Sequence, residues 1–296
     1  MVLVAGISFI ILYPLIAKLC LSFMAERDLY DPTIRFVAKN FTLENYKLAL
    51  EQLKYFESIL NTFVISFFSS FLQLIACTLV GYGFARFEFP FKKLLFGIVL
   101  LTLIVPPQAL MLPTYLHFRH FDIFGIFKLI MGEPLKFLDS YIPFFLLSAT
   151  TLGLKNGLYI YIIIQFFRGL PKELEEAALV DGAGMFKTFY RIMLPNAVPI
   201  MMTVFLFSFV WQWNDSFYTS LFLTNMPVLS ISLGSLADNV QQFREWQVGT
   251  VVTLSPSYIS MMNNTGSLLV IAPLLIVYGF AQRYFVEGIE RSGIVG

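Results

Sequence analysis

The stretch Gly169-Leu-Pro-Lys-Glu-Leu-Glu-Glu-Ala-Ala-Leu-Val-Asp-Gly-Ala-Gly-Met-Phe-Lys-Thr-Phe-Tyr-Arg-Ile-Met-Leu-Pro195 is far more charged than the sequence on either side of it. Pro171 suits the first turn of a helix, where a missing N–H costs nothing. Glu173, Glu175 and Glu176 suit the positive N-terminal end of a helix dipole. Gly182 suits a left-handed C-cap. The pattern therefore predicts a short helix that ends near Gly182.

A second short helix is predicted directly after the first. Its apolar residues recur at i, i+3, i+4 and i+7, and they are Phe186, Phe189, Tyr190 and Met193. Small residues, among them Ala177, Ala178, Ala183 and Gly184, give the pair a surface that another protein can approach closely. The stretch therefore predicts a helix–turn–helix outside the bilayer. The alternative is a solvated linker, but a linker would not need two capped helices with an apolar face.

The rest of the 296-residue chain is strongly apolar, with 57% hydrophobic and 13% charged residues. Soluble domains carry about 25% charged residues. The composition excludes disorder, and two cysteines exclude a disulfide scaffold. With 20 basic and 19 acidic residues there is no net basic field for nucleic acid. These numbers favour an all-α polytopic membrane protein.

Apolar runs long enough to cross a membrane occur six times, because a crossing helix needs about 20 mostly apolar residues. The runs are 2–23, 59–84, 94–116, 141–167, 196–224 and 266–284. We therefore expect about six transmembrane helices. If both termini are cytoplasmic, the basic residues divide evenly between inner and outer loops, but the inner loops are shorter. The higher density of positive charge in the inner loops favours cytoplasmic termini.

Polar side chains recur along the fifth run and are candidates for a solute pathway. They fall at i, i+4, i+7 and i+11, on one face of a single predicted helix, and they are Ser208, Gln212, Asp215 and Thr219. Trp211 and Asn214 lie beside them. A charged residue in the membrane normally faces a cavity or a partner, and sugars bind through hydrogen bonds and aromatic stacking. The alternative is a hydrogen-bonded helix seam with an interfacial aromatic belt.

Two other features interrupt the apolar runs. Lys155 lies in Gly153-Leu-Lys-Asn-Gly157, where the two glycines permit close helix packing. Either Lys155 lines a translocation path, or the span begins after Asn156 and the lysine extends toward the outer interface. Pro106 and Pro107 interrupt the third run, and we expect a simple kink there.

The motifs Glu176-Ala177-Ala178, Asp181-Gly182-Ala183 and Leu194-Pro195 resemble the EAA loop of ABC importer permeases. More closely, the chain resembles the MalG-type permease subunit of carbohydrate ABC importers. Further support for this resemblance comes from Asn40-Phe-Thr-Leu-Glu-Asn-Tyr46 and from the tail, residues 281–296. The resemblance covers nearly the whole chain and is weakest in residues 121–140.

This resemblance implies a type I ABC importer fold, the MetI-like permease fold, in a multi-pass protein of the bacterial plasma (inner) membrane. It implies a second, MalF-like permease, two ATPase subunits and an extracytoplasmic sugar-binding protein that delivers the carbohydrate substrate. It also implies a division of the chain into a first transmembrane helix (1–24), an external segment (25–57), a permease core (58–286) with its EAA loop at 169–195, and a cytoplasmic tail (287–296).

The resemblance also assigns roles to residues. The EAA loop would form a coupling helix in a cleft of the ATPase, with contacts from Glu175, Glu176, Ala177, Ala178, Asp181, Gly182 and Ala183. Glu176 would pair with a basic residue of the ATPase, and Gly182 would supply the turn. In the tail, Ser292, Gly293 and Gly296 would contact the ATPases. The substrate-pathway candidates are Ser208, Trp211, Gln212, Asn214 and Asp215, although MalG-type subunits make no comparable sugar contacts. The outer loop at 225–263 would reach toward the binding protein.

The chain carries no G-x-x-x-x-G-K-[ST] phosphate loop. We therefore expect ATP and Mg²⁺ on the partner ATPase, and no cofactor on this chain. No nucleophile–base arrangement is recognisable, so we expect no enzyme and no catalytic residue. His117 and His120 alone make a poor metal site, because closed zinc sites use four ligands.

Three rival functions stay open at this point. One is the same machine for another solute, such as a polyamine or a peptide, because an EAA loop does not name the cargo. The second is an ATPase-independent secondary transporter, which would be expected to show internal repeats and buried ionisable residues. The third is a structural subunit without solute contacts.

Overall fold

A computed structural model describes residues 1–34 and 36–293, and from residue 283 onward it describes the backbone alone. Apart from two isolated β-bridges, the described residues form only helices and loops. The chain divides into two compact units. Unit 1 contains Met1–Thr62 and Met226–Val277, and unit 2 contains Phe63–Asn225 and Tyr278–Gly296. The predicted all-α polytopic class is confirmed.

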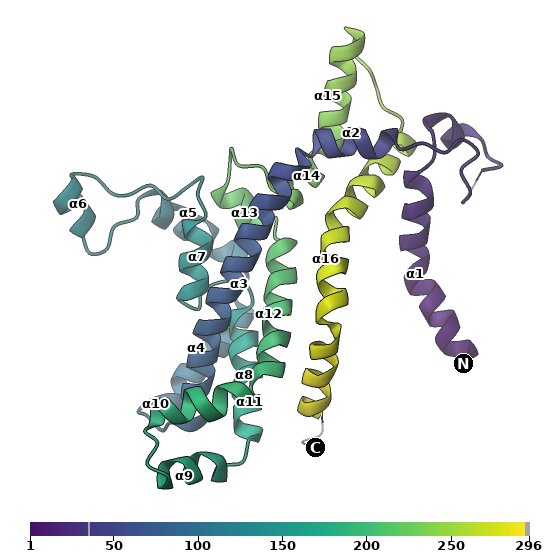
Figure 1. The fold of residues 1–296 in the computed structure, drawn as a ribbon. Helices are drawn as coiled ribbons and strands as arrows, with labels where there is room; N and C mark the ends of the chain where they lie inside the picture. The colour runs from purple at the N-terminus through teal and green to yellow at the C-terminus, as the bar shows by residue number, and fades with distance from the viewer. Residues whose placement is uncertain (35, 294–296) are drawn as a thin grey trace. The chain divides into compact units, whose positions relative to one another are not determined.

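Unit 1 combines the N-terminal part of the chain with a second stretch that lies close to the C-terminus. Its elements are α1 (Val2–Ser22), the short 3₁₀ helix η1 (Glu26–Tyr30), α2 (Glu44–Gln52), the start of α3 (Tyr55–Arg86), α14 (Leu229–Gly234), α15 (Leu236–Val248) and most of α16 (Pro256–Gly293). In Figure 1, α15 stands beside α2. Its buried core consists of Ala49, Leu53, Leu236, Val240, Leu254, Tyr258, Met261 and Met262.

Unit 2 is a helical bundle that holds the EAA-like loop at one end. After α3 come α4 (Lys92–Ile104), η2 (Pro107–Leu110), α5 (Met111–Arg119), α6 (Ile126–Met131), α7 (Ile142–Ala149), α8 (Asn156–Gly169), α9 (Glu173–Val180), α10 (Met185–Thr188), the π-helix η3 (Phe189–Met193), α11 (Leu194–Asn196), α12 (Val198–Trp213) and α13 (Phe217–Phe222). Its core is formed by α3, α8 and the segment from η3 to α12, with the buried residues Leu74, Cys77, Tyr82, Tyr159, Ile160, Ile163, Ile164, Phe167, Met193, Ala197, Ile200 and Val204.

Helix α8 packs against both α4 and α12. Its contact with α4 depends on Gly157, because an added Cβ there would lie 2.6 Å from Thr102 Oγ1 and 2.8 Å from the Val99 carbonyl oxygen. Small residues let helix backbones approach closely. The close packing predicted from this glycine is therefore confirmed.

The spans differ from six unbroken helices. Within the described part of the chain, three helices are long and apolar enough to cross a membrane, namely Val2–Ser22, Tyr55–Arg86 and Pro256–Gln282. The number rises to five if each of two bent pairs counts as one span. The fourth run contains two helices, α7 and α8, which are separated by residues 150–155. The predicted run at 141–167 is therefore not one continuous helix.

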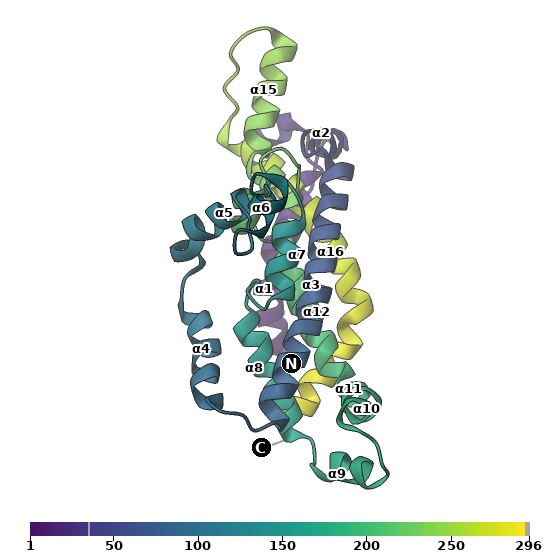
Figure 2. The same ribbon diagram turned by 90° about the vertical axis from the view of Figure 1, so that its left-hand side faces the viewer.

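The proline pair does more than introduce a simple kink. Between Lys92–Ile104 and Pro107–Arg119 the chain bends by 101°. Proline lacks the N–H that would continue the helix, and its ring also disfavours helical backbone at the preceding residue. Figure 2 shows the chain leaving α4 and turning into α5. The expectation of a simple kink at Pro106 and Pro107 is therefore wrong.

The fifth run is also broken. Helix α12 ends at Trp213, and α13 starts at Phe217. The pattern Ser208, Gln212, Asp215 and Thr219 does not lie on one face of a single helix, so that prediction is wrong.

Candidate functional site

The EAA-like loop begins with α9, whose C-terminal end is a Schellman motif. The Gly182 N–H donates to the Leu179 carbonyl at 3.0 Å, and the Ala183 N–H donates to the Ala178 carbonyl at 2.9 Å. Gly182 has a φ of +77°, in the left-handed region that favours glycine at this position. The predicted glycine C-cap is confirmed. Pro171, in contrast, precedes the first helical residue, Glu173, by two positions and lies outside the first turn.

The second predicted helix is a composite of α10, η3 and α11. Its apolar residues point in two directions. Met193 is fully buried, and the Phe189 ring lies 4.6 Å from the Tyr82 ring, measured between centroids. Phe186 and Tyr190 are 80% and 62% exposed. One side of the segment is therefore fixed to unit 2, and the other side is open to a partner.

Glu175 fixes α9 to the end of α3. The Tyr82 hydroxyl donates to Glu175 Oε1 at 3.0 Å, and Arg86 Nε lies 3.4 Å from Glu175 Oε2. The Arg86 guanidinium also donates to the Leu170 carbonyl at 2.8 Å. The structure thus directs Glu175 toward its own chain, whereas Glu176 is exposed.

The outward surface of α9, α10 and η3 combines apolar and acidic residues. The exposed large apolar side chains are Leu174, Leu179, Val180, Met185, Phe186 and Tyr190. Glu176, Ala177 and Asp181 are exposed on the same loop, whereas Ala178 is buried. We call these six apolar residues with Glu176, Ala177 and Asp181 the coupling surface. In Figure 1, α9 and α10 lie at the end of unit 2 where α8 stops. Several large apolar side chains exposed on one short segment are typical of a surface that contacts another protein.

The predicted tail contact lies largely beyond the described part of the chain. The backbone of Ser292 and Gly293 belongs to α16, but their side-chain surroundings are not described. Gly296 lies outside the described residues. The tail contact therefore stays a prediction.

Ser208 belongs to a buried polar cluster that joins three helices. Its hydroxyl donates to Gln73 Oε1. The Gln73 amide nitrogen donates to the Leu154 carbonyl at 2.6 Å and to Asn156 Oδ1. Gln73 lies on α3, Asn156 starts α8, and Ser208 lies on α12. Sequence reasoning missed Gln73, although a lone amide in an apolar run was a signal.

Asp215 caps the helix that follows it. Its carboxylate accepts from the backbone N–H groups of Tyr218 and Thr219 at 3.3 and 3.0 Å, and from the Thr219 hydroxyl at 3.0 Å. A carboxylate in this place satisfies N–H groups that have no partner within the helix. Gln212 is also buried. Ser208 and Asp215 therefore form their hydrogen bonds within unit 2.

Trp211 and Asn214, in contrast, lie on the exposed surface of unit 2. Trp211 is 49% exposed, and Asn214 is exposed. The Lys155 ammonium lies 4.8 Å from the centroid of the Trp211 ring, within the range of a cation–π interaction. Lys155 has a φ of +60° and immediately precedes α8. The five pathway candidates are thus divided between the interior of unit 2 and its exposed face.

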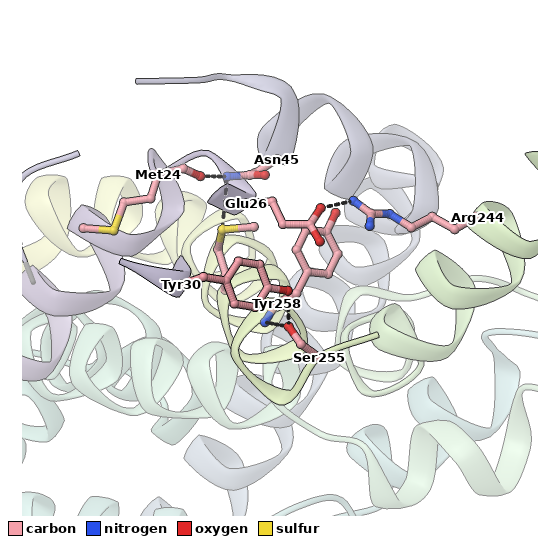
Figure 3. Close-up of polar contacts among 8 residues, drawn as sticks. Met24, Glu26, Tyr30, Asn45, Arg244, Ser255 and Tyr258 are labelled. Atoms are coloured by element: carbon pink, nitrogen blue, oxygen red, sulfur yellow. Dashed lines mark hydrogen bonds and ion pairs between the residues drawn. The ribbon is translucent and has the colours of Figure 1, made fainter. Parts of the chain in front are cut away.

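In unit 1, polar contacts tie the base of α15 to neighbouring segments. Arg244 forms an ion pair with Glu26 at 2.8 Å, and its guanidinium lies 4.1 Å from the Tyr258 ring centroid. The Tyr30 hydroxyl donates to Ser255 Oγ at 2.9 Å (Figure 3). Further along α15, Trp246 is 81% exposed.

Comparison with known proteins identifies the family. Residues 77–291 match the family described as binding-protein-dependent transport system inner membrane component. The chain belongs to this family. It is 30% identical over 257 residues to the osmoprotective compounds uptake permease protein GgtD of Synechocystis sp., covering 86% of this chain and 75% of GgtD.

Other relatives have names that refer to starch degradation products and to arabinooligosaccharides. A probable starch degradation products transport system permease protein, AmyC of Thermoanaerobacterium thermosulfurigenes, is 25% identical, covering 92% of this chain and 88% of AmyC. The arabinooligosaccharides transport system permease protein AraQ of Bacillus subtilis is 28% identical, covering 82% and 74% respectively.

A solved structure shares the fold. It is a bacterial ABC transporter involved in the import of the acidic polysaccharide alginate, and it matches with a TM-score of 0.73 at 19% identity over 96% of this chain and 94% of that chain. The MetI-like permease fold is confirmed. Permeases of this family are multi-pass inner-membrane subunits that work with a second permease, an ATPase and a substrate-binding protein.

Proposed function

We propose that this chain is a translocation subunit of an ATP-driven carbohydrate importer. It pairs with a MalF-like permease, two ATPase subunits and an extracytoplasmic sugar-binding protein. Both termini face the cytoplasm, and ATP and Mg²⁺ bind on the ATPase. The names of AmyC and AraQ support oligosaccharides as the cargo class.

The observation that carries this proposal is the two-sided construction of the EAA-like loop. One side of α9 is fixed through Glu175 to Tyr82 and Arg86. The other side presents the coupling surface, with Glu176 free to meet a basic residue of the ATPase. A helix that docks in a moving partner and is fixed to its own bundle transmits that movement.

The route of transmission follows from the packing. Tyr82 contacts both Glu175 and Phe189, so α3 receives movement from α9 and from η3. The buried cluster at Gln73 then links α3 to α8 and α12. ATPase closure therefore shifts packed helices against one another, which is a known way of switching between two conformations.

The pathway candidates have two roles in this account. Trp211 and Asn214 face the solute, because they are the exposed members of the set. Ser208, Gln212 and Asp215 hold the wall in place from inside unit 2. This division supports a transport role over a purely structural one, since a structural subunit would not need an exposed indole and a cation on the same face.

Co-purification tests the proposal directly. The chain is tagged and extracted from native membranes in mild detergent, and associated proteins are identified by mass spectrometry. Recovery of a second multi-span protein and a nucleotide-binding subunit is expected. Recovery of the chain alone, from an extract in which other membrane complexes survive, would favour an ATPase-independent transporter and overturn the proposal.

A further inference from the structure

Lys155 is an ammonium group among the helices of unit 2 with no acidic neighbour. Of the described side chains, none places a carboxylate oxygen within 4.0 Å of its nitrogen. No acidic residue occurs in the first turn of α8 either. The nearest described partner of the charge is the Trp211 ring, at 4.8 Å. Lys155 is exposed and lies directly before α8, so its charge is accessible to a ligand.

Lys155 and Trp211 lie near the ends of α8 and α12 that are farthest from the EAA-like loop. Helix α8 has 14 residues, so Lys155 lies about 21 Å from its far end at a rise of 1.5 Å per residue. Trp211 lies about 20 Å along α12, counted from Val198. Both residues thus lie about 20 Å along their helices from the side of unit 2 that holds the EAA-like loop.

The geometry also separates Lys155 from a lysine that simply reaches for the interface. Such a lysine extends its stem toward the headgroups. Here the stem instead brings the ammonium over the ring of a neighbouring helix. Trp211 is nevertheless 49% exposed, and Asn214 follows it one helical turn later on the exposed side. A cation, an indole and an amide therefore share one accessible face.

We propose that Lys155, Trp211 and Asn214 form a contact site for a carboxylate-bearing oligosaccharide, such as a uronate oligomer. The indole stacks on a pyranose ring, the ammonium pairs with the sugar carboxylate, and the amide binds hydroxyl groups. A neutral sugar would use only the indole and the amide, and it would leave the exposed ammonium without an anionic partner. This inference rests on the proposed carbohydrate function and narrows it to acidic cargo.

A reporter cysteine tests the site without knowledge of the natural cargo. The complete importer is placed in nanodiscs after Cys20→Ser and Cys77→Ser substitution, which removes both native thiols. Asn214→Cys is then modified by an anionic sulfonate thiol reagent or a cationic trimethylammonium one, with and without ATP and vanadate. Lys155→Gln is compared with Lys155→Arg, which keeps the charge.

Both reagents are expected to react, with the anionic one favoured. Lys155→Gln should lower the ratio of anionic to cationic rates by about threefold or more, because it removes one positive charge near the reporter. Lys155→Arg should keep the ratio. An unchanged ratio in Lys155→Gln would overturn the inference. So would a reporter unreactive to both reagents, which is the result expected if lipid headgroups or another subunit cover the lysine.

Trigalacturonate and its methyl ester then test the cargo class with one carbohydrate skeleton. Trigalacturonate should slow modification of the reporter at least threefold when Lys155 is present, and its effect should disappear in Lys155→Gln. The methyl ester should not protect. Equal protection by both would show a neutral-sugar site, and no protection by trigalacturonate would exclude a uronate site. Loss of the ATPase during purification would instead count against the proposed function, so the two failures are distinguishable.

Discussion

Arg86 Nε lies 3.4 Å from Glu175 Oε2, and this pair joins the end of α3 to the first turn of α9. The Arg86 side chain is only 5% exposed, whereas that of Glu175 is 17% exposed. The pair therefore lies at the point where a docked coupling helix would pass its movement to the membrane bundle. It also distinguishes two adjacent glutamates, since Glu176 faces outward.

Removing the Glu175 carboxylate alone should lower the stability of the protein more than removing both Glu175 and Arg86. Glu175→Ala leaves the buried Arg86 without its counter-charge, and we expect a loss of about 2 kcal/mol in stability. Arg86→Met combined with Glu175→Ala should recover part of that loss, because no charge is then left buried. Thermal unfolding of the detergent-solubilised complex measures both. If the double variant is no more stable than Glu175→Ala, the ion pair between Arg86 and Glu175 does not stabilise the contact between α3 and α9.

Two glycines between α9 and α10 allow the left-handed turn to be tested with a matched control. Gly182→Ala places a Cβ at a φ of +77° and should cost about 1 kcal/mol. Gly184 has a φ of −69° and open space around the position of an added Cβ, so Gly184→Ala should be nearly neutral. ATPase stimulation by the binding protein should fall in Gly182→Ala alone. Equal behaviour of the two variants would contradict a role for the left-handed turn.

The buried cluster around Gln73 should behave as one unit. Gln73→Leu leaves the Leu154 carbonyl, Asn156 and Ser208 without their shared partner, and each unsatisfied buried group costs about 1–3 kcal/mol. Ser208→Ala removes only one of these contacts and should cost less. Unfolding of the two single variants and the double variant in a cycle measures the coupling. Additive losses would show that Gln73 and Ser208 act independently.

Asp139 should make stability depend on pH on the exposed side of unit 2. The backbone N–H groups of Thr224 and Asn225 hold the pKa of its carboxyl below its ordinary value. A lowered folded-state pKa stabilises the protein above the unfolded value of about 3.9, and this contribution is lost as pH falls through the folded pKa. Asp139→Asn should therefore lower the melting temperature at pH 7, and the difference from the native chain should shrink as pH falls below about 3.9. A constant difference between pH 7 and pH 3 would contradict this.

Much of the architecture follows from local sequence patterns, because long apolar runs and a glycine C-cap are readable without tertiary contacts. The 101° bend at Pro106 and Pro107 was signalled by the prolines, but its size depends on packing. The break after Trp213 had a signal in Asp215, a favourable helix-capping residue that the periodic pattern concealed. The break before α8 has no proline, and Thr151 and Lys155 adopt positive φ there.

The candidate site was less predictable, because the direction of a side chain depends on distant residues. Glu175 and Glu176 are indistinguishable in the sequence, and only the position of Arg86 separates them. Ser208 belongs to the interior because its hydroxyl donates a hydrogen bond to Gln73, which lies on another helix. The exposed pairing of Lys155 with Trp211 likewise joins two helices that the sequence treats separately.

The central claim is that the exposed face of α9 docks on an ATPase, and one charge reversal tests it most directly. Uptake of cargo driven by ATP is measured in membranes that carry Glu176→Lys, with Glu133→Lys as a control at an exposed acidic residue outside the loop. The account predicts that Glu176→Lys reaches the membrane and pairs with its partner permease but loses nearly all coupled uptake, while Glu133→Lys transports normally. Uptake at the native rate in Glu176→Lys would contradict the account.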